Sequence, residues 1–356
     1  MASECRYEAN WRGVMFGPEL EFVTVDRDYK PIDAHGILER SDYYGKNIKR
    51  ELAKEQVEIF VGPSKHLNVL YNGAKRVVGD AIRLCKKEGV RLLPVAFYQN
   101  HELMSLSEGE RFEKVLKCFG SKGREYAFPL NGDQINIGAR SDEEALEIHN
   151  RFRVLLPYIV GLGVSSPFRD GELTRIKSQR IASLDKIISN FSKDSPFPRR
   201  FDSMRDYEKD VERNSAEGDP SIYYPYVRMK PEDGIAAEIR ALDKQPSLKE
   251  TFGFFALCKG LMDYDTSEIE RTRDLEEEFD RSVREGVFDM EFARGLVKYA
   301  MKHLPDSERK LLTPLSRKIQ VGTPADVMGA MVGEGKSLNE IYERLIQCNE
   351  KDEIFL

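Results

Sequence analysis

Residues 15–26 read Met15-Phe16-Gly17-Pro18-Glu19-Leu20-Glu21-Phe22-Val23-Thr24-Val25-Asp26. Alternate side chains of a β-strand share a face, so a strand here places Glu19 and Glu21 on the same face. The other residues are largely apolar, which predicts that the two carboxylates lie close together and partly buried. Such a pair is costly unless a cation neutralises it or it takes up protons, and a divalent ion is the natural partner. For this motif alone, a solvated edge strand remains the alternative.

The same alternation occurs in two further segments. Residues 131–138 place Gln134 and Asn136 on one face of a strand, with isoleucines on the other. Residues 234–242 place Glu238 and Arg240 on one face, again opposite apolar side chains. Three strands that each present a polar pair from an apolar frame predict one curved sheet around a polar site that holds a metal ion.

A fourth segment, residues 51–61, returns to alternation. Val57, Ile59 and Val61 point one way, and Glu58 points the other way. Because glutamates are numerous in this segment, solvated surface positions remain the alternative for Glu51 and Glu58.

These motifs together resemble the type 2 glutamate-cysteine ligases, a carboxylate-amine ligase branch of the glutamine synthetase superfamily. The resemblance also includes Ser165-Ser166-Pro167-Phe168-Arg169-Asp170-Gly171 and an aspartate, Asp243, after the Glu-x-Arg strand. It runs in the expected order from the first strand almost to the C-terminus. It implies an α+β fold whose curved antiparallel sheet, of glutamine-synthetase-like type, forms an open active-site funnel with helices on the outer face.

The resemblance also implies the chemistry. It predicts an ATP- and magnesium-dependent ligase that forms a γ-glutamyl amide bond through an acyl phosphate. The oxygen ligands it assigns to Mg²⁺ are Glu19, Glu21, Glu51, Glu58, Gln134 and Glu238. Arg240 and Glu238 belong to the catalytic centre, where Arg240 binds phosphate. Candidates for holding phosphate or a substrate carboxylate are Arg180, Arg228 and Asn136, although the two arginines are equally compatible with a surface role.

One departure from the family pattern concerns the substrate. Many members have histidines where this chain has Gln134 and Asn136. An amide oxygen can also ligate magnesium, so the site is retained. Two alternatives stay open: a ligase for a different acid or amine, and a non-catalytic binding or regulatory protein that keeps the fold. We also expect Glu19→Gln or Glu238→Gln to remove activity with little loss of stability, because each relieves repulsion between like charges.

Composition limits the partners. The 356 residues include 33% charged residues of both signs and carry a net charge of -6, which argues against nucleic-acid binding. The longest apolar run, around residues 154–164, is interrupted by Pro157 and two glycines and is too short to span a membrane. Five widely spaced cysteines, with Cys5 the first, and the absence of a signal-peptide pattern predict a cytoplasmic protein. The expected partners are small-molecule acid and amine substrates, and a homodimer is left open.

Local patterns predict the elements around these strands within one catalytic domain over residues 1–356, with residues 247–356 mainly helical. Residues 66–88 form a helix that ends at Gly89, and a strand follows over 90–97. Ser141 begins a helix, with Glu144 as its capping-box partner, that ends at Pro157. Residues 190–217 form a substrate-covering loop or a plain surface connection. Thr323-Pro324-Ala325-Asp326 begins the last helix, over 325–345.

Overall fold

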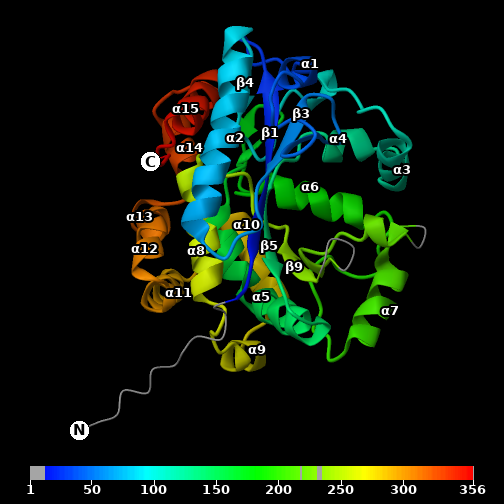
Figure 1. Ribbon diagram of the computed structural model, residues 1–356, viewed down its shortest axis with the longest axis vertical. Helices are drawn as coiled ribbons and strands as arrows, with labels where there is room; N and C mark the ends of the chain where they lie inside the picture. The colour runs from blue at the N-terminus through cyan, green and yellow to red at the C-terminus, as the bar shows by residue number, and fades with distance from the viewer. Residues whose placement is uncertain (1–12, 217–218, 231–234, 356) are drawn as a thin grey trace.

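The computed structural model describes residues 13–216, 219–230 and 235–355. Outside these ranges lie the N-terminal segment with Cys5, residue 217 at the end of the predicted polar segment, and Gly234 at the start of the predicted third strand. The described residues form an α+β fold (Figure 1) with an antiparallel sheet, as predicted.

The main sheet has seven strands in the described residues. Its order is β2-β3-β1-β5-β9-β8, with β4 beside β1, and every pair is antiparallel. The strands are β1 (Phe16–Val25), β2 (Ile48–Arg50), β3 (Gln56–Phe60), β4 (Arg91–Leu93), β5 (Asp133–Gly138), β8 (Val227–Met229) and β9 (Ala236–Ile239). A separate hairpin joins β6 (Phe168–Arg169) to β7 (Glu172–Leu173). The segments singled out in the sequence are therefore neighbours in one sheet.

One face of this sheet is the main apolar core. Its alternate side chains from β1, β3, β5 and β9 are fully buried, among them Leu20, Ile59, Ile135 and Ile239. They pack with the helices α2 (Leu67–Lys87), α5 (Asp142–Gly163) and α8 (Leu248–Gly260). Burying each large apolar side chain favours the fold by roughly 1.5–3 kcal/mol. Because the apolar face of each strand is held against the core in this way, the polar side chains at the alternate positions point away from it.

The remaining helices surround the sheet. Figure 1 shows α3 (Glu110–Cys118), α4 (Gly123–Ala127), α6 (Gln179–Ile188) and α7 (Met204–Asn214) on the side of β1 opposite α2 and α8. A short helix, α1 (His35–Leu38), precedes β2. The C-terminal helices are α9 (Ser267–Thr272), α10 (Leu275–Glu285), α11 (Met290–His303), α12 (Asp306–Arg309), α13 (Thr313–Val321), α14 (Pro324–Gly333) and α15 (Leu338–Lys351). None of the described helices combines the length and the hydrophobicity that crossing a membrane requires.

Several predicted helix ends are confirmed. After α2, Gly89 has φ +74°, and the Val90 amide donates to the Cys85 carbonyl, as in a Schellman motif. The Ser141 hydroxyl accepts from the Glu144 amide at the start of α5. Thr323 and Asp326 form a complete capping box at the start of α14.

The predicted end of α5 at Pro157 is wrong. The helix continues to Gly163, and all its residues from Phe152 onward are buried. Proline removes one helical hydrogen bond and crowds the preceding turn. Packing on every side of this segment, including α10 and strands β8 and β9, holds the helix in place despite that cost.

Three other boundaries differ from the predictions. The last predicted helix is two helices, because Gly335 adopts φ +82° and Ser337 caps a new helix. The strand predicted over 90–97 joins the main sheet only over Arg91–Leu93, and the third polar strand is a strand over Ala236–Ile239. Residues 190–217 are not a continuous loop, because Ser203 caps α7 within them.

Candidate active site

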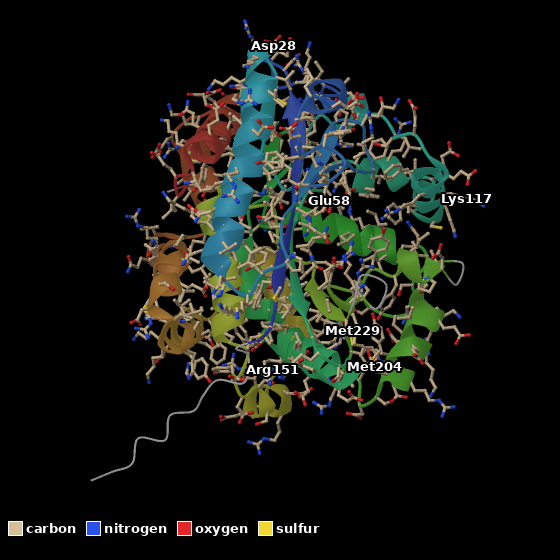
Figure 2. The ribbon with its side chains drawn as sticks, viewed as in Figure 1. Asp28, Glu58, Lys117, Arg151, Met204 and Met229 are labelled. Atoms are coloured by element: carbon tan, nitrogen blue, oxygen red, sulfur yellow. The ribbon has the colours of Figure 1, made fainter. Side chains whose placement is uncertain are left out.

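The polar side chains of the central strands form one row across the sheet. From one end of the row to the other, the strand register pairs Glu58 with Glu21, Glu19 with Gln134, Asn136 with Glu238, and Glu238 with Arg228. Figure 2 labels Glu58 on β3 and Met229 on β8, the strands at the two ends of this row. The structure therefore brings together segments that are more than 200 residues apart in the chain.

One end of the row is acidic, and we call Glu21, Glu51 and Glu58 the acidic end. Burial raises the pKa of Glu21, although the Gly132 amide donates to Oε2 at 2.5 Å and Gln134 Nε2 donates to Oε1 at 2.7 Å. Burial, and then the charges of Glu58 and Glu21, raise the pKa of Glu51 well above its usual value. Burial and the neighbouring carboxylates raise the pKa of Glu58 to about 7. Full ionisation here is unfavourable without a cation.

The other end of the row is basic, and we call Arg228, Lys230 and Arg240 the basic end. All three contact Glu238, whose side chain is fully buried. Arg228 Nε lies 2.5 Å and Arg240 Nη1 lies 3.1 Å from Glu238 Oε2, while Lys230 Nζ lies 3.3 Å from Oε1. Burial opposes ionisation of Glu238, but the charges of Arg240, Arg228 and Lys230 outweigh it and lower the pKa to about 2.

Arg180, in the first turn of α6, reaches the row from above the sheet. Its Nη2 donates to the Arg240 carbonyl at 3.0 Å. The residue is only 5% exposed, and among the residues that the structure describes its buried Nε and Nη1 have no hydrogen-bond partner. The guanidinium lies against Gly132, where a Cβ atom would come within 2.3 Å of Nη2. Buried unpaired donors of a cation are rare, and here they point to an anionic ligand.

Lys230 is a candidate site residue that no sequence motif predicted. Its Nζ also lies 3.0 Å from Glu19 Oε1, so the lysine bridges Glu19 and Glu238. Asn136 Nδ2 donates to the same Glu19 oxygen at 3.1 Å. A signal was present: Arg228 and Lys230 alternate with the buried Val227 and Met229, as in the other polar strands.

Tyr224 was also missed. The Arg240 guanidinium lies 4.7 Å from the centre of the Tyr224 ring, in a cation–π contact that orients the arginine. No periodic pattern marks this tyrosine, because it lies in the irregular segment before β8.

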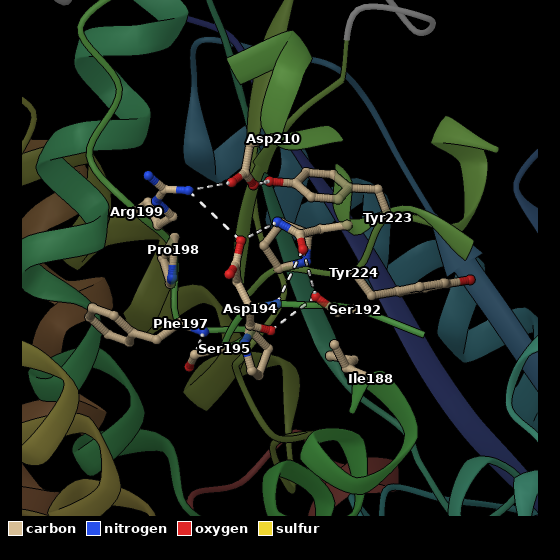
Figure 3. A pocket seen from close by; sticks show the side chains of 13 residues that line it. Ile188, Ser192, Asp194, Ser195, Phe197, Pro198, Arg199, Asp210, Tyr223 and Tyr224 are labelled. Carbon is tan, nitrogen blue, oxygen red and sulfur yellow. Dashed lines mark hydrogen bonds and ion pairs between the residues drawn. The ribbon is translucent and has the colours of Figure 1, made fainter. Parts of the chain in front are cut away.

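Tyr224 also lines a cavity (Figure 3) beside residues 190–217, the polar segment for which a substrate-covering loop is one of the two predictions. The cavity measures about 10 Å³, about the space of a single water, and is too small for a substrate. The segment around it is tied down, because Asn214 Oδ1 accepts from the amides of Lys193 and Asp194. Arg199 pairs with Asp210 on the neighbouring helix. These contacts favour the alternative of a surface connection over a free cover.

A metal ion fits the acidic end by its chemistry. In the parts of the chain that the structure describes, no group of three or more Asp, Glu, His or Cys side chains forms a ready-made metal site. Magnesium is commonly held by one or two carboxylates together with substrate phosphates, so a complete protein cage is not required. Buried carboxylates with raised pKa values suit that role. Glu19 and Glu238 are less suited to bind magnesium, because the Lys230 ammonium already contacts both carboxylates.

We expect Glu58→Gln to stabilise the metal-free protein. The pKa of Glu58, about 7, lies above its ordinary value of 4.5. Its ionisation therefore does not lower the free energy of unfolding below pH 4.5, and lowers it by the full amount above pH 7. At about pH 8 the gain should be on the order of 1–3 kcal/mol, and at about pH 5 it should be small. Melting temperatures in a chelator at both pH values test this. Glu208→Gln, which changes an exposed glutamate, should shift neither, and a less stable Glu58→Gln protein at pH 8 would contradict the prediction.

Comparisons with known proteins identify the family and the fold. A model of glutamate-cysteine ligase family 2 matches residues 15–309. An uncharacterized protein of Archaeoglobus fulgidus is 22% identical over 96% of this chain and 100% of its own. A protein of Roseiflexus castenholzii, named as a candidate glutamate–cysteine ligase 2, is 26% identical over 69% of this chain and 65% of its own. The chain thus spans slightly less than two thirds of that relative.

A solved structure shares the fold. Glutamate–cysteine ligase from Francisella tularensis, in complex with AMP, superposes with a TM-score of 0.66 over 95% of this chain and 88% of that chain. The sequence identity is 12%, so the similarity concerns the fold alone.

Proposed function

The chain belongs to glutamate-cysteine ligase family 2, and from this membership and the charges along its sheet we propose an ATP-dependent ligase that joins a carboxylic acid to an amine. In the proposed reaction a carboxylate oxygen attacks the γ-phosphorus of ATP, and ADP leaves. The amine nitrogen then attacks the acyl carbon, loses a proton and displaces phosphate. The product is an amide.

The separation of charge along one row of side chains carries this proposal. Phosphoryl transfer to a carboxylate brings two anions together, so the site must supply positive charge where the phosphate lies. The basic end and Arg180 do so, and the unpaired Nε and Nη1 of Arg180 suit an anionic oxygen. At the acidic end, Glu21 lies on β1 and Glu58 on β3, which β5 separates from β9 and β8, and Glu51 directly follows β2.

Magnesium is the proposed cofactor. Glu21, Glu51 and Glu58 would hold it, with the Gln134 amide oxygen as a further ligand. When bound, it neutralises phosphate charge and orients the nucleotide. AMP in the structurally similar Francisella tularensis ligase supports a nucleotide site in this fold. We propose that the row lines an open funnel above the sheet.

Glutamate and cysteine are the proposed substrates, because of the family. Because Gln134 and Asn136 depart from the family pattern, a ligase for a different acid or amine is the alternative within the ligase class. The non-catalytic alternative is less well supported, because the carboxylates, Arg240 and the unpaired donors of Arg180 are all present together.

The test is the product of ATP turnover. We expect purified protein with ATP, Mg²⁺, glutamate and a panel of amino acids and polyamines to release ADP and phosphate in proportion to the amide formed. Release should require both the acid and the amine. AMP and pyrophosphate would exclude the acyl-phosphate route, because they indicate adenylation. No nucleotide consumption with any pair, in protein that still binds ATP, would favour the non-catalytic alternative.

A further inference from the structure

Lys230 occupies a place where the family resemblance puts a metal ion. Its ammonium lies 3.0 Å from Glu19 Oε1 and 3.3 Å from Glu238 Oε1. The residue is 8% exposed, and Glu238 is fully buried. Magnesium lies about 2.1 Å from its oxygen ligands, so an ion shared by these two oxygens would adjoin the ammonium. Two cations on the same oxygen atoms repel each other and compete.

The charge balance also argues against a metal at this end. Glu19 and Glu238 carry two negative charges, while Arg228, Lys230 and Arg240 carry three positive charges around them. Asn136 Nδ2 donates a hydrogen bond to Glu19 Oε1, the oxygen that also contacts Lys230. One lone pair of this oxygen is therefore already in use. A further divalent cation would enter a cluster that is already positive.

We infer that the Lys230 ammonium replaces the divalent cation between Glu19 and Glu238, so that this protein binds metal at the acidic end only. This inference rests on the proposed function. Lys230 is a positioning residue: it holds the two carboxylates together and adds a fixed positive charge beside the proposed phosphate position. Because the ammonium belongs to a side chain of the protein, this charge is present at any metal concentration.

Mn²⁺ titration followed by electron paramagnetic resonance tests the inference on the full chain without turnover. We expect Lys230→Met to bind one more Mn²⁺ per chain than the parent, because the two carboxylates are released. Lys230→Arg keeps a cation and should show no gain. Lys209→Met, which removes an exposed lysine charge on α7, is the matched control and should also match the parent. Equal stoichiometry in Lys230→Met and the parent would overturn the inference.

A second measurement does not depend on the folding of Lys230→Met. In the parent background, Glu19→Gln should leave the Mn²⁺ stoichiometry unchanged, whereas Glu21→Gln should lower it or weaken binding at least tenfold. Loss of an ion in Glu19→Gln would overturn the inference. Failure of the proposed function is distinguished by a different measurement: no ADP would be released, whatever number of Mn²⁺ ions the protein binds.

Discussion

Glu238→Gln is expected to lower the free energy of unfolding by about 3–5 kcal/mol, the usual cost of removing one partner of a buried ion pair. The substitution leaves Arg228, Lys230 and Arg240 facing a neutral amide in a buried position. The pKa of Glu238, about 2, lies below its ordinary value of 4.5. Its stabilising contribution is therefore complete above 4.5 and is lost as the pH falls toward 2.

Urea unfolding of the parent and Glu238→Gln, near neutral pH and at about pH 3, measures this difference. The two proteins should differ most at the higher pH and converge as the pH falls. Glu58→Gln is the matched control, because it neutralises a carboxylate of the same row and should change stability in the opposite direction. A Glu238→Gln protein as stable as the parent would contradict the assignment of its three cationic partners.

This result would reverse the expectation from the sequence. The sequence shows Glu238 as one of several glutamates on polar strand faces, so its removal was expected to relieve repulsion. The structure surrounds Glu238 with cations, so the reason for that expectation, repulsion between like charges, does not apply to it. For Glu58, whose neighbours are carboxylates, the same reasoning holds.

Arg180→Met is expected to lower kcat/KM by about 100-fold or more, the usual loss when a donor to a developing anion is removed. Its Nε and Nη1 have no hydrogen-bond partner among the described residues, so the expected loss arises from the missing contact with an anionic ligand. Arg180→Lys should recover only part of the rate, because an ammonium cannot reproduce the planar fork. Steady-state kinetics and melting temperatures of the three proteins separate lost turnover from lost stability.

Gly132→Ala tests the same contact without removing a charge. Its Cβ atom would lie 2.3 Å from Arg180 Nη2, so the guanidinium must move. We expect a smaller loss of kcat/KM than in Arg180→Met, with the fold retained. Lys186→Met, on the exposed side of the same helix, is the control and should turn over like the parent. Full activity in both Arg180→Met and Gly132→Ala would remove Arg180 from the site.

Alternation of polar and apolar residues was enough to predict the faces of the central strands. Burying Leu20, Ile59, Ile135 and Ile239 on one face leaves the alternate residues on the other, and a one-residue shift would reverse this along the whole strand. Capping and turn residues such as Ser141 and Gly89 act through local hydrogen bonds and backbone angles, so they too could be read from the sequence.

Only the tertiary structure decided which charges meet. The order of the strands, with β9 between β5 and β8, brings Lys230 to Glu19 across more than 200 residues, and no local pattern contains that pairing. α5 passes through Pro157 because packing around the helix outweighs the local cost of proline. Local conformation depends on neighbours in the chain, and the sequence determined it here. The sign of the charge around each glutamate depends on neighbours in space, and only the fold determines those.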